Sequence, residues 1–199
     1  MNSSNTFTPI KLSDLRRSLA FEPGKGLWRS GDAGRAWRVR QGVVRLDSTT
    51  SAGHSVFGSL AIAGDIVGCE TLLFGAYTFN ATALTQCELS PWPEGDAAAA
   101  SASLLESLAK AQRRAADLVA LRGGQAVDRV LGLVRLLADG AGRVVLPARQ
   151  DIADITDLRF ETISRIIKTL ERAGVLAAVH IDGVRASRGY AVDLSAMPA

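Results

Sequence analysis

Residues 149–170, which read RQDIADITDLRFETISRIIKTL, decide the fold of the C-terminal part of the chain. In the second half of this stretch apolar residues recur every three or four positions, which is the spacing of one helix face. We predict a helix from about Phe160 to Arg172, preceded by a shorter helix and a turn around 156–158. Asp157 in this turn is expected to cap the second helix. The inward faces are predicted to consist of Ile152, Ala153 and Ile155 in the first helix, and of Ile163, Ile166, Ile167 and Leu170 in the second.

The outward face of the second predicted helix carries groups that can read the edges of DNA bases. An arginine such as Arg165 can form two hydrogen bonds with guanine, and a glutamate such as Glu161 can accept one from the amino group of cytosine. Serine can pair with several bases, and Phe160 can contact a thymine methyl group. We therefore predict base contacts by Phe160, Glu161, Ser164 and Arg165, and contacts to DNA phosphates by Arg149, Gln150, Thr162 and Lys168.

A β-hairpin is predicted after these helices, over residues 175–192. Asp182-Gly183 lies near its middle and is a strong signal for a two-residue turn. A helix-turn-helix followed by a hairpin is a winged helix. The alternative is a three-helix packing unit whose charged face is merely solvated. The polar helix face, the hairpin and the local positive charge together favour DNA binding.

Charge is distributed unevenly along the 199 residues, although the net charge is only +3. Neither Lys nor Arg occurs between Arg45 and Lys110, whereas basic residues recur from Lys110 onward. This asymmetry predicts two domains with different roles. The chain has only two cysteines, no evident signal peptide and no apolar run long enough to span a bilayer. We therefore expect a cytoplasmic protein with reduced thiols and no membrane partner.

The N-terminal part is predicted to form a small β-roll. From about Leu27 to Trp92 the chain reads as a series of short strands. Gly42 indicates a bulge or hairpin bend, and Gly64-Asp65 marks a turn. Many short strands with frequent glycine are typical of a barrel or roll.

A long helix is predicted from Asp96 to Leu121, because this segment is rich in Ala and Leu and contains neither Gly nor Pro. Five apolar residues in it, spaced by four, three, four and three positions, form a heptad seam suited to pairing with another helix. The alternative is that the same stripe packs on the protein's own core. The small side chains in the seam permit close approach of two helices and favour dimerisation. The predicted seam consists of Leu104, Leu108, Ala111, Ala115 and Leu118.

Three segments carry a specific resemblance: RQDIAD at 149–154, ETISR at 161–165 and LERAGVL at 170–176. They resemble the C-terminal domain of the CRP/FNR family of bacterial transcription regulators. A weaker likeness is visible in AGDIVG at 63–68 and CEL at 87–89. The resemblance implies an α+β fold with a cyclic-nucleotide-binding-like β-roll over 1–95, a dimerisation helix over 96–122 and a winged helix-turn-helix over 123–199.

The recognition residues are similar to those of the FNR branch of this family, in which Glu161, Ser164 and Arg165 have their counterparts. The CRP branch has Arg in place of Phe160 and Gly in place of Ser164. The resemblance therefore implies a TTGAT-like half-site, read twice by a homodimer on a palindrome. If the protein activates transcription, RNA polymerase is expected as a further partner, although the sequence does not identify the contacts.

The β-roll is expected to lack a site for a cyclic nucleotide. In members of the family that bind one, a Gly-Glu pair holds the ribose and an Arg-Ser pair holds the cyclic phosphate. Here Gly68-Cys69-Glu70 only approximates the first, and Tyr77-Thr78 stands at the second. With no cation between Arg45 and Lys110, we expect nothing in the roll to neutralise a buried phosphate, and an unpaired buried anion is costly.

No cofactor or metal site is predicted. Cys69 and Cys87 are too few for the four-cysteine iron–sulfur cluster of oxygen-sensing FNR proteins. Two small buried thiols are expected, with a redox pair as the alternative. His54 is a candidate haem ligand, but a lone histidine in a roll is more often a surface residue or hydrogen-bonded. His180, in the predicted wing, is expected to face phosphate or solvent.

These features predict a transcription regulator whose effector is unknown. The alternative is a non-specific or architectural DNA-binding protein with a degenerate sensor domain. An enzyme is not expected, because the sequence offers no phosphate-binding loop, no cluster of metal ligands and no nucleophile beside a base.

Overall fold

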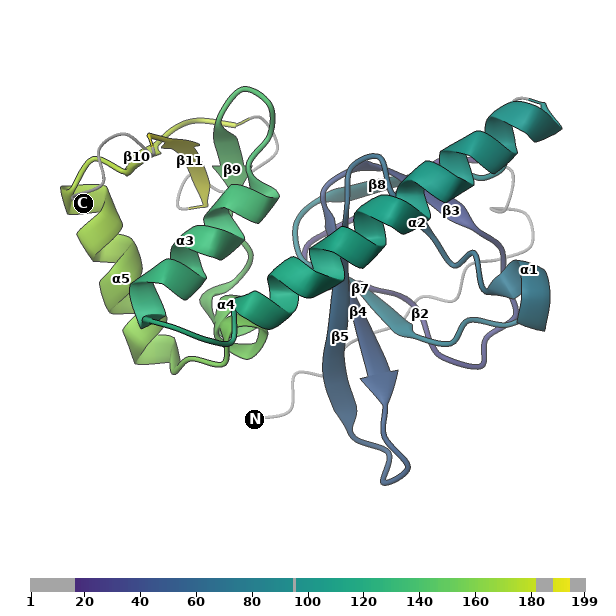
Figure 1. Cartoon of the computed structure of the whole chain (residues 1–199), viewed down its shortest axis with the longest axis horizontal. Helices are drawn as coiled ribbons and strands as arrows, with labels where there is room; N and C mark the ends of the chain where they lie inside the picture. Colours follow the sequence, from purple (N-terminus) through teal and green to yellow (C-terminus); the bar gives the residue numbers. More distant parts are fainter. Residues whose placement is uncertain (1–16, 95, 182–187, 194–199) are drawn as a thin grey trace. The chain divides into compact units, whose positions relative to one another are not determined.

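The structure, a computed structural model, describes residues 17–94, 96–181 and 188–193. It has the predicted α+β class. The chain divides into two compact units, one ending at Arg114 and the other beginning at Ala115, so the division falls within the long helix α2 (Ala97–Ala120). Figure 1 shows the order of the elements along the chain. None of the described helices is long and apolar enough to cross a membrane.

The first unit is a roll of two four-stranded antiparallel sheets, as predicted. One sheet has the strand order β1-β8-β3-β6 and the other β2-β7-β4-β5. The bend at Gly42 joins β3 to β4 with a positive φ of 89°, a conformation that glycine adopts without strain. The strands are β1 (Leu19–Phe21), β2 (Gly26–Trp28), β3 (Trp37–Gln41), β4 (Val43–Thr49), β5 (Ser55–Ile62), β6 (Ile66–Val67), β7 (Asn80–Ala83) and β8 (Cys87–Pro91), with the short helix α1 (Thr71–Phe74) between β6 and β7.

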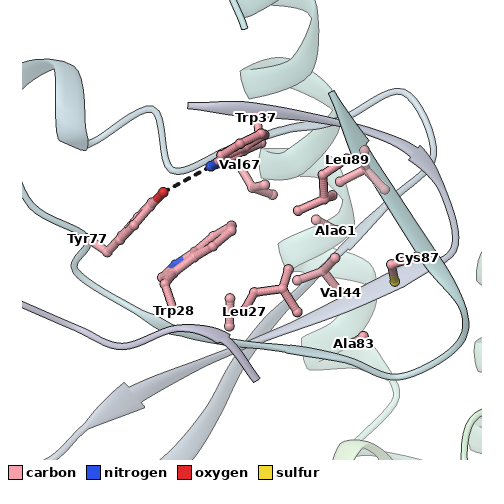
Figure 2. Packing of buried hydrophobic residues seen from close by; sticks show 12 residues of the cluster. Leu27, Trp28, Trp37, Val44, Ala61, Val67, Tyr77, Ala83, Cys87 and Leu89 are labelled. Carbon is pink, nitrogen blue, oxygen red and sulfur yellow. Dashed lines mark hydrogen bonds between the residues drawn. The ribbon is translucent and has the colours of Figure 1, made fainter. Parts of the chain in front are cut away.

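Aromatic and aliphatic side chains from both sheets fill the interior of the roll (Figure 2). Alternation along the strands produces this core: in β7, for example, Ala81 and Ala83 are completely buried while Asn80 and Thr82 are only half-buried. Trp37 and Leu89 are also completely buried.

Helix α2 packs along the roll through polar contacts as well as apolar ones. The Ser107 hydroxyl accepts a hydrogen bond of 2.7 Å from the backbone N–H of Ile66. Trp92 donates its indole N–H to Ser103 at 3.2 Å. Arg114 forms a buried ion pair with Asp65. These contacts fix which face of α2 lies against the β-roll.

Besides the end of α2, the described residues of the second unit form three helices beside a three-stranded antiparallel sheet of order β10-β11-β9. In this sheet Tyr190 of β11 lies opposite Val144 of β9 and Ala178 of β10. The predicted hairpin is therefore present, while its predicted turn at Asp182-Gly183 lies outside the described residues. The elements are α3 (Ala126–Leu137), β9 (Arg143–Val145), α4 (Arg149–Thr156), α5 (Phe160–Arg172), β10 (Leu176–Ala178) and β11 (Gly189–Val192).

The predicted capping role of Asp157 is wrong. Asp157 ends α4 instead, in the left-handed conformation with φ of 54°, and its backbone N–H bonds the carbonyl of Ala153. Aspartate tolerates this conformation better than most residues. The residue that precedes α5 is Arg159, whose side chain makes no capping hydrogen bond.

Candidate nucleic-acid interface

Helix α5 is held in place by a continuous apolar face. Ile163, Ile167 and Leu170 are at most 4% exposed, and they pack within the group formed by α3, α4 and α5. Fully burying one such side chain contributes about 1.5–3 kcal/mol, so this face fixes the orientation of the helix. The opposite face is thereby presented to solvent.

The predicted base readers and two of the predicted phosphate contacts share this outer face. Glu161, Arg165 and Lys168 are exposed, and Phe160 is 46% exposed, which is high for a large apolar side chain. Thr162 and Ser164 are half-buried at the edge of the face. Within the part of the chain that the structure describes, the charged groups of Glu161, Arg165 and Lys168 make no hydrogen bond, so they are free to bind another molecule.

Side-chain hydrogen bonds from α3, α4 and the residues after α2 stabilise the turn between α4 and α5. The buried hydroxyl of Thr156 donates to the carbonyl of Ile152 at 2.7 Å. Arg129 of α3 donates to the carbonyl of Thr156 at 3.3 Å. Arg122 reaches the carbonyl of Asp154 at 3.5 Å. These bonds satisfy carbonyls at the C-terminal end of α4 and stabilise the helix-turn-helix.

The two predicted phosphate contacts at the start of α4 differ in their surroundings. Gln150 is exposed and donates to Asp154 at 3.0 Å, an exposed bond that a phosphate can replace at little cost. Arg149 is half-buried, and its Nη1 atom is buried with no hydrogen-bond partner. Arg149 therefore lies in a pocket rather than on an open surface.

The exposed stripe of α2 is shifted from the predicted seam. Leu104 packs against the buried cluster of Ala36, Ile66, Trp92 and Ala100, which is the alternative packing on the protein's own core. Ala111 is half-buried and Leu118 is 4% exposed, whereas Leu108 and Ala115 are exposed. The exposed stripe, which is apolar except at its centre, consists of Leu105, Leu108, Gln112, Ala115 and Val119.

In the roll, Tyr77 stands at the position that corresponds to the phosphate-binding arginine of cyclic-nucleotide-binding proteins. Its ring stacks on Trp28 with the ring centres 4.3 Å apart. Its hydroxyl accepts a 3.0 Å hydrogen bond from the indole of Trp37 (Figure 2). The same hydroxyl donates a hydrogen bond of 2.9 Å to the carbonyl of Arg35.

Two glycines leave just enough room for this tyrosine. A Cβ atom at Gly34 would overlap the Tyr77 ring, and one at Gly68 would lie 2.7 Å from its Cε1 atom. The ring is therefore enclosed on its edges as well as on its face. The protein's own side chains therefore fill the space around this ring.

The prediction that the roll contains no cation is wrong, because arginines on either side of the uncharged stretch belong to the roll or reach it. Strands β3 and β4 carry Arg38, Arg40 and Arg45, and Arg114 reaches the roll from α2. Each is already paired with a carboxylate: Arg38 and Arg40 with Glu94, Arg45 with Asp47, and Arg114 with Asp65.

Both cysteines are free thiols in environments that disfavour the thiolate. Burial raises the pKa of Cys87 to about 11, and its S–H donates to the carbonyl of Val43 at 3.2 Å. Burial, followed by the charge of Glu70, raises the pKa of Cys69. His54 is exposed in the β4–β5 hairpin, and His180 is exposed as well. The described residues contain no group of three or more potential metal ligands.

The fold and this interface define the class of protein: a β-roll of the cyclic-nucleotide-binding type joined by a long helix to a winged helix. The family model "Cyclic nucleotide-binding domain" matches residues 18–103. The nitrogen fixation regulation protein FixK of Bradyrhizobium diazoefficiens is 32% identical over 183 residues, covering 83% of this chain and 76% of FixK. FixK of Rhizobium meliloti is 29% identical over 175 residues, covering 85% and 82%.

A solved structure of a CRP-family transcriptional regulator from Thermus thermophilus has the same fold. It matches with a TM-score of 0.66 and 25% identity, over 89% of this chain and 93% of that one. The chain belongs to the CRP/FNR family of transcription regulators. Its winged helix is accordingly a DNA-binding domain, in agreement with the family prediction.

Sequence analysis missed three features of the molecule. The exposed stripe of α2 was missed because two overlapping heptad repeats run along the same helix. The enclosure of Tyr77 was missed because Trp28, Trp37 and the two glycines are far from it in sequence. The environment of Arg149 was missed because Tyr190, which also lines its pocket, lies on another element. The signal in the sequence for the exposed stripe was the spacing of Leu105 and Val119, two apolar residues that lie two heptads apart.

Proposed function

We propose that this protein binds a palindromic DNA site as a homodimer, with one α5 helix of each copy in a major groove. The single observation that carries the proposal is the outer face of α5. It presents Phe160, Glu161 and Arg165 to solvent on a helix whose opposite face is buried. A guanidinium, a carboxylate and an aromatic ring on one rigid surface are the groups that distinguish base pairs in the major groove.

Base and phosphate contacts have separate roles in this proposal. Glu161, Ser164 and Arg165, with Phe160 at the first turn, select the sequence. Arg149, Gln150, Thr162 and Lys168 contact the backbone and hold the helix in register. By resemblance to the FNR branch, the half-site is similar to TTGAT.

Dimerisation is proposed to use the exposed stripe of α2. Leu105 and Val119 are 69% and 73% exposed, which leaves a large apolar area uncovered in a single copy. Leu108 is 47% exposed, and Ala115 is small enough for two helices to approach closely. The spacing of three and four residues is that of a coiled-coil seam.

Gln112 lies at the centre of this stripe and is exposed. A single polar residue in an otherwise apolar seam fixes the register of two helices at some cost in stability, so Gln112 is compatible with a specific pairing. A twofold dimer then places its half-sites about 34 Å apart, one turn of the double helix.

The proposed regulator does not respond to cyclic AMP or cyclic GMP, because Tyr77 fills the interior of the roll and the described arginines of β3 and β4 are paired. No cofactor is assigned. It would act in the cytoplasm and, at activated promoters, contact RNA polymerase.

Selection of bound fragments from random double-stranded DNA tests this function. The full chain is expected to enrich an inverted repeat whose half-sites are one helical turn apart, with affinity at least about a thousandfold above that for random DNA. Recovery of DNA without a shared motif would refute sequence-specific regulation and favour a non-specific or architectural DNA-binding protein.

A further inference from the structure

A small pocket lies in the winged-helix unit, on the side of α5 that does not carry the base readers. Its volume is about 200 Å³. The lining comes from the β9–α4 connection, from the first residue of α4, from α5, and from β11 with the residue before it. It consists of Leu146, Pro147, Arg149, Ile167, Arg188 and Tyr190.

Among the described residues, the lining of this pocket has two cations and no anion. Arg149 is half-buried, and its Nη1 atom is buried without a hydrogen-bond partner. Across residues 17–94, 96–181 and 188–193, neither the Arg149 nor the Arg188 guanidinium donates a hydrogen bond to any acceptor. A buried donor of this kind is normally satisfied by a partner. The two like charges and the orphaned N–H therefore indicate an anionic ligand.

The nearby carboxylate is already engaged. Glu171 accepts a hydrogen bond of 2.8 Å from the hydroxyl of Tyr190. Burial, together with this carboxylate, raises the pKa of Tyr190 to about 12, so the tyrosine stays neutral and keeps donating to Glu171. The backbone of Arg188 is fixed as well, because its carbonyl accepts from the N–H of Leu146 at 2.9 Å. The backbone of Arg188 is therefore anchored to the β9–α4 connection, which carries two other lining residues.

We propose that Arg149 and Arg188 together bind a phosphate-type oxyanion in this pocket. Guanidinium groups form short, bidentate, charge-assisted hydrogen bonds with phosphate oxygens. The volume is below the roughly 300 Å³ at which pockets for drug-sized ligands begin, so it suits a single phosphate group better than a nucleotide.

The phosphate has two possible sources, the DNA backbone and a free anion. The DNA source deepens the proposed function and rests on it, since it adds Arg188 to the backbone contacts. Binding of a free anion does not require DNA, so phosphate binding is measured first in the absence of DNA.

Inorganic phosphate is titrated into the full chain without DNA, with binding followed by calorimetry in chloride buffer. Saturable binding is expected. Arg188→Gln and Arg149→Gln should each weaken it about tenfold or more, because each removes a charge-assisted pair. Arg188→Lys, which keeps the charge but loses the bidentate geometry, should give an intermediate loss. Arg172→Gln is the matched control, since Arg172 is exposed in the last turn of α5 and does not line the pocket.

The second arm measures DNA affinity against salt concentration for the selected palindrome. If the DNA backbone supplies the phosphate, free phosphate competes with DNA. The slope of log affinity against log salt then falls by about 0.9 per subunit in Arg188→Gln. If a free anion is the occupant, phosphate and DNA bind together and the slope is unchanged. Both results support the site.

Two results would overturn the proposed oxyanion site at Arg149 and Arg188. One is the absence of saturable phosphate binding together with an unchanged salt slope in Arg188→Gln. The other is equal phosphate binding by wild type, Arg188→Gln and Arg172→Gln, which would reflect an adventitious ion only. Phosphate binding without DNA binding would refute the proposed function and leave the pocket intact, so the two failures are distinguishable.

Discussion

Removing Arg114 should destabilise the β-roll strongly. Its guanidinium pairs with Asp65 and also donates to the carbonyl of Leu60 at 3.2 Å, and the two charged side chains are only 8% and 4% exposed. Arg114→Met keeps most of the side-chain volume but leaves a buried carboxylate whose remaining partner is the N–H of Ile62, at 2.8 Å. Breaking a buried pair in this way costs about 3–5 kcal/mol.

Urea unfolding followed by tryptophan fluorescence measures this effect. All three tryptophans, Trp28, Trp37 and Trp92, lie in the unit that contains the roll, so the signal reports the unfolding of that unit. With a slope of about 2 kcal/mol per M, the midpoint of Arg114→Met should fall by roughly 1.5–2.5 M urea.

A double variant separates the ion pair from simple loss of packing. Asp65→Asn keeps an oxygen for the N–H of Ile62 while removing the buried charge. Combined with Arg114→Met, it should therefore recover a large part of the lost stability. If the two substitutions destabilise additively, or if Arg114→Met unfolds at the wild-type midpoint, the reasoning about the buried pair is refuted.

Three further predictions concern the roll and α2. Tyr77→Phe should lower the free energy of unfolding by about 1–3 kcal/mol, because the indole N–H of Trp37 loses its acceptor; an unchanged urea midpoint would contradict this. Because the folded pKa of Cys87 is about 11 against an ordinary 9.0, its contribution to stability is present below pH 9 and lost as the pH rises to about 11. At pH 8 iodoacetamide should alkylate Cys69 faster than Cys87, and equal rates would argue against the burial of Cys87. Ala115→Glu should convert the dimer to monomer in sedimentation, whereas Ala102→Glu, an identical change at an exposed position of α2 outside the stripe, should not.

The extent of the helix-turn-helix could be predicted from sequence because its information is local. Isoleucines spaced by three and four residues and the polar residues between them define α5 without reference to distant parts of the chain. The capping role of Asp157 could not be predicted in the same way. A single residue between two helices can end the first or begin the second, and the backbone angle decides which.

The α2 seam and the interior of the roll depend on contacts that are distant in sequence. Both the stripe containing Leu104 and the stripe containing Leu105 have heptad spacing, and only the packing of Leu104 on Trp92 and its neighbours shows which one is left exposed. Likewise, the sequence shows a tyrosine at position 77 without showing that Trp28 stacks on it. The charge of the roll could not be predicted from the order of charges along the chain for the same reason. Arg114 pairs with Asp65, which lies 49 positions earlier in the sequence.

The central claim, that the outer face of α5 reads bases, is tested most directly by a double-mutant cycle between Arg165 and a guanine of the selected palindrome. Wild type and Arg165→Ala are each measured on the palindrome and on versions in which one guanine of each half-site is replaced. For one of the guanines the coupling is expected to be about 1–3 kcal/mol, with Arg165→Ala indifferent to the replacement. Arg172→Ala, measured in parallel, should show no coupling. If Arg165→Ala discriminates against every replaced guanine as strongly as wild type does, Arg165 does not read a guanine and the assigned face of α5 is contradicted.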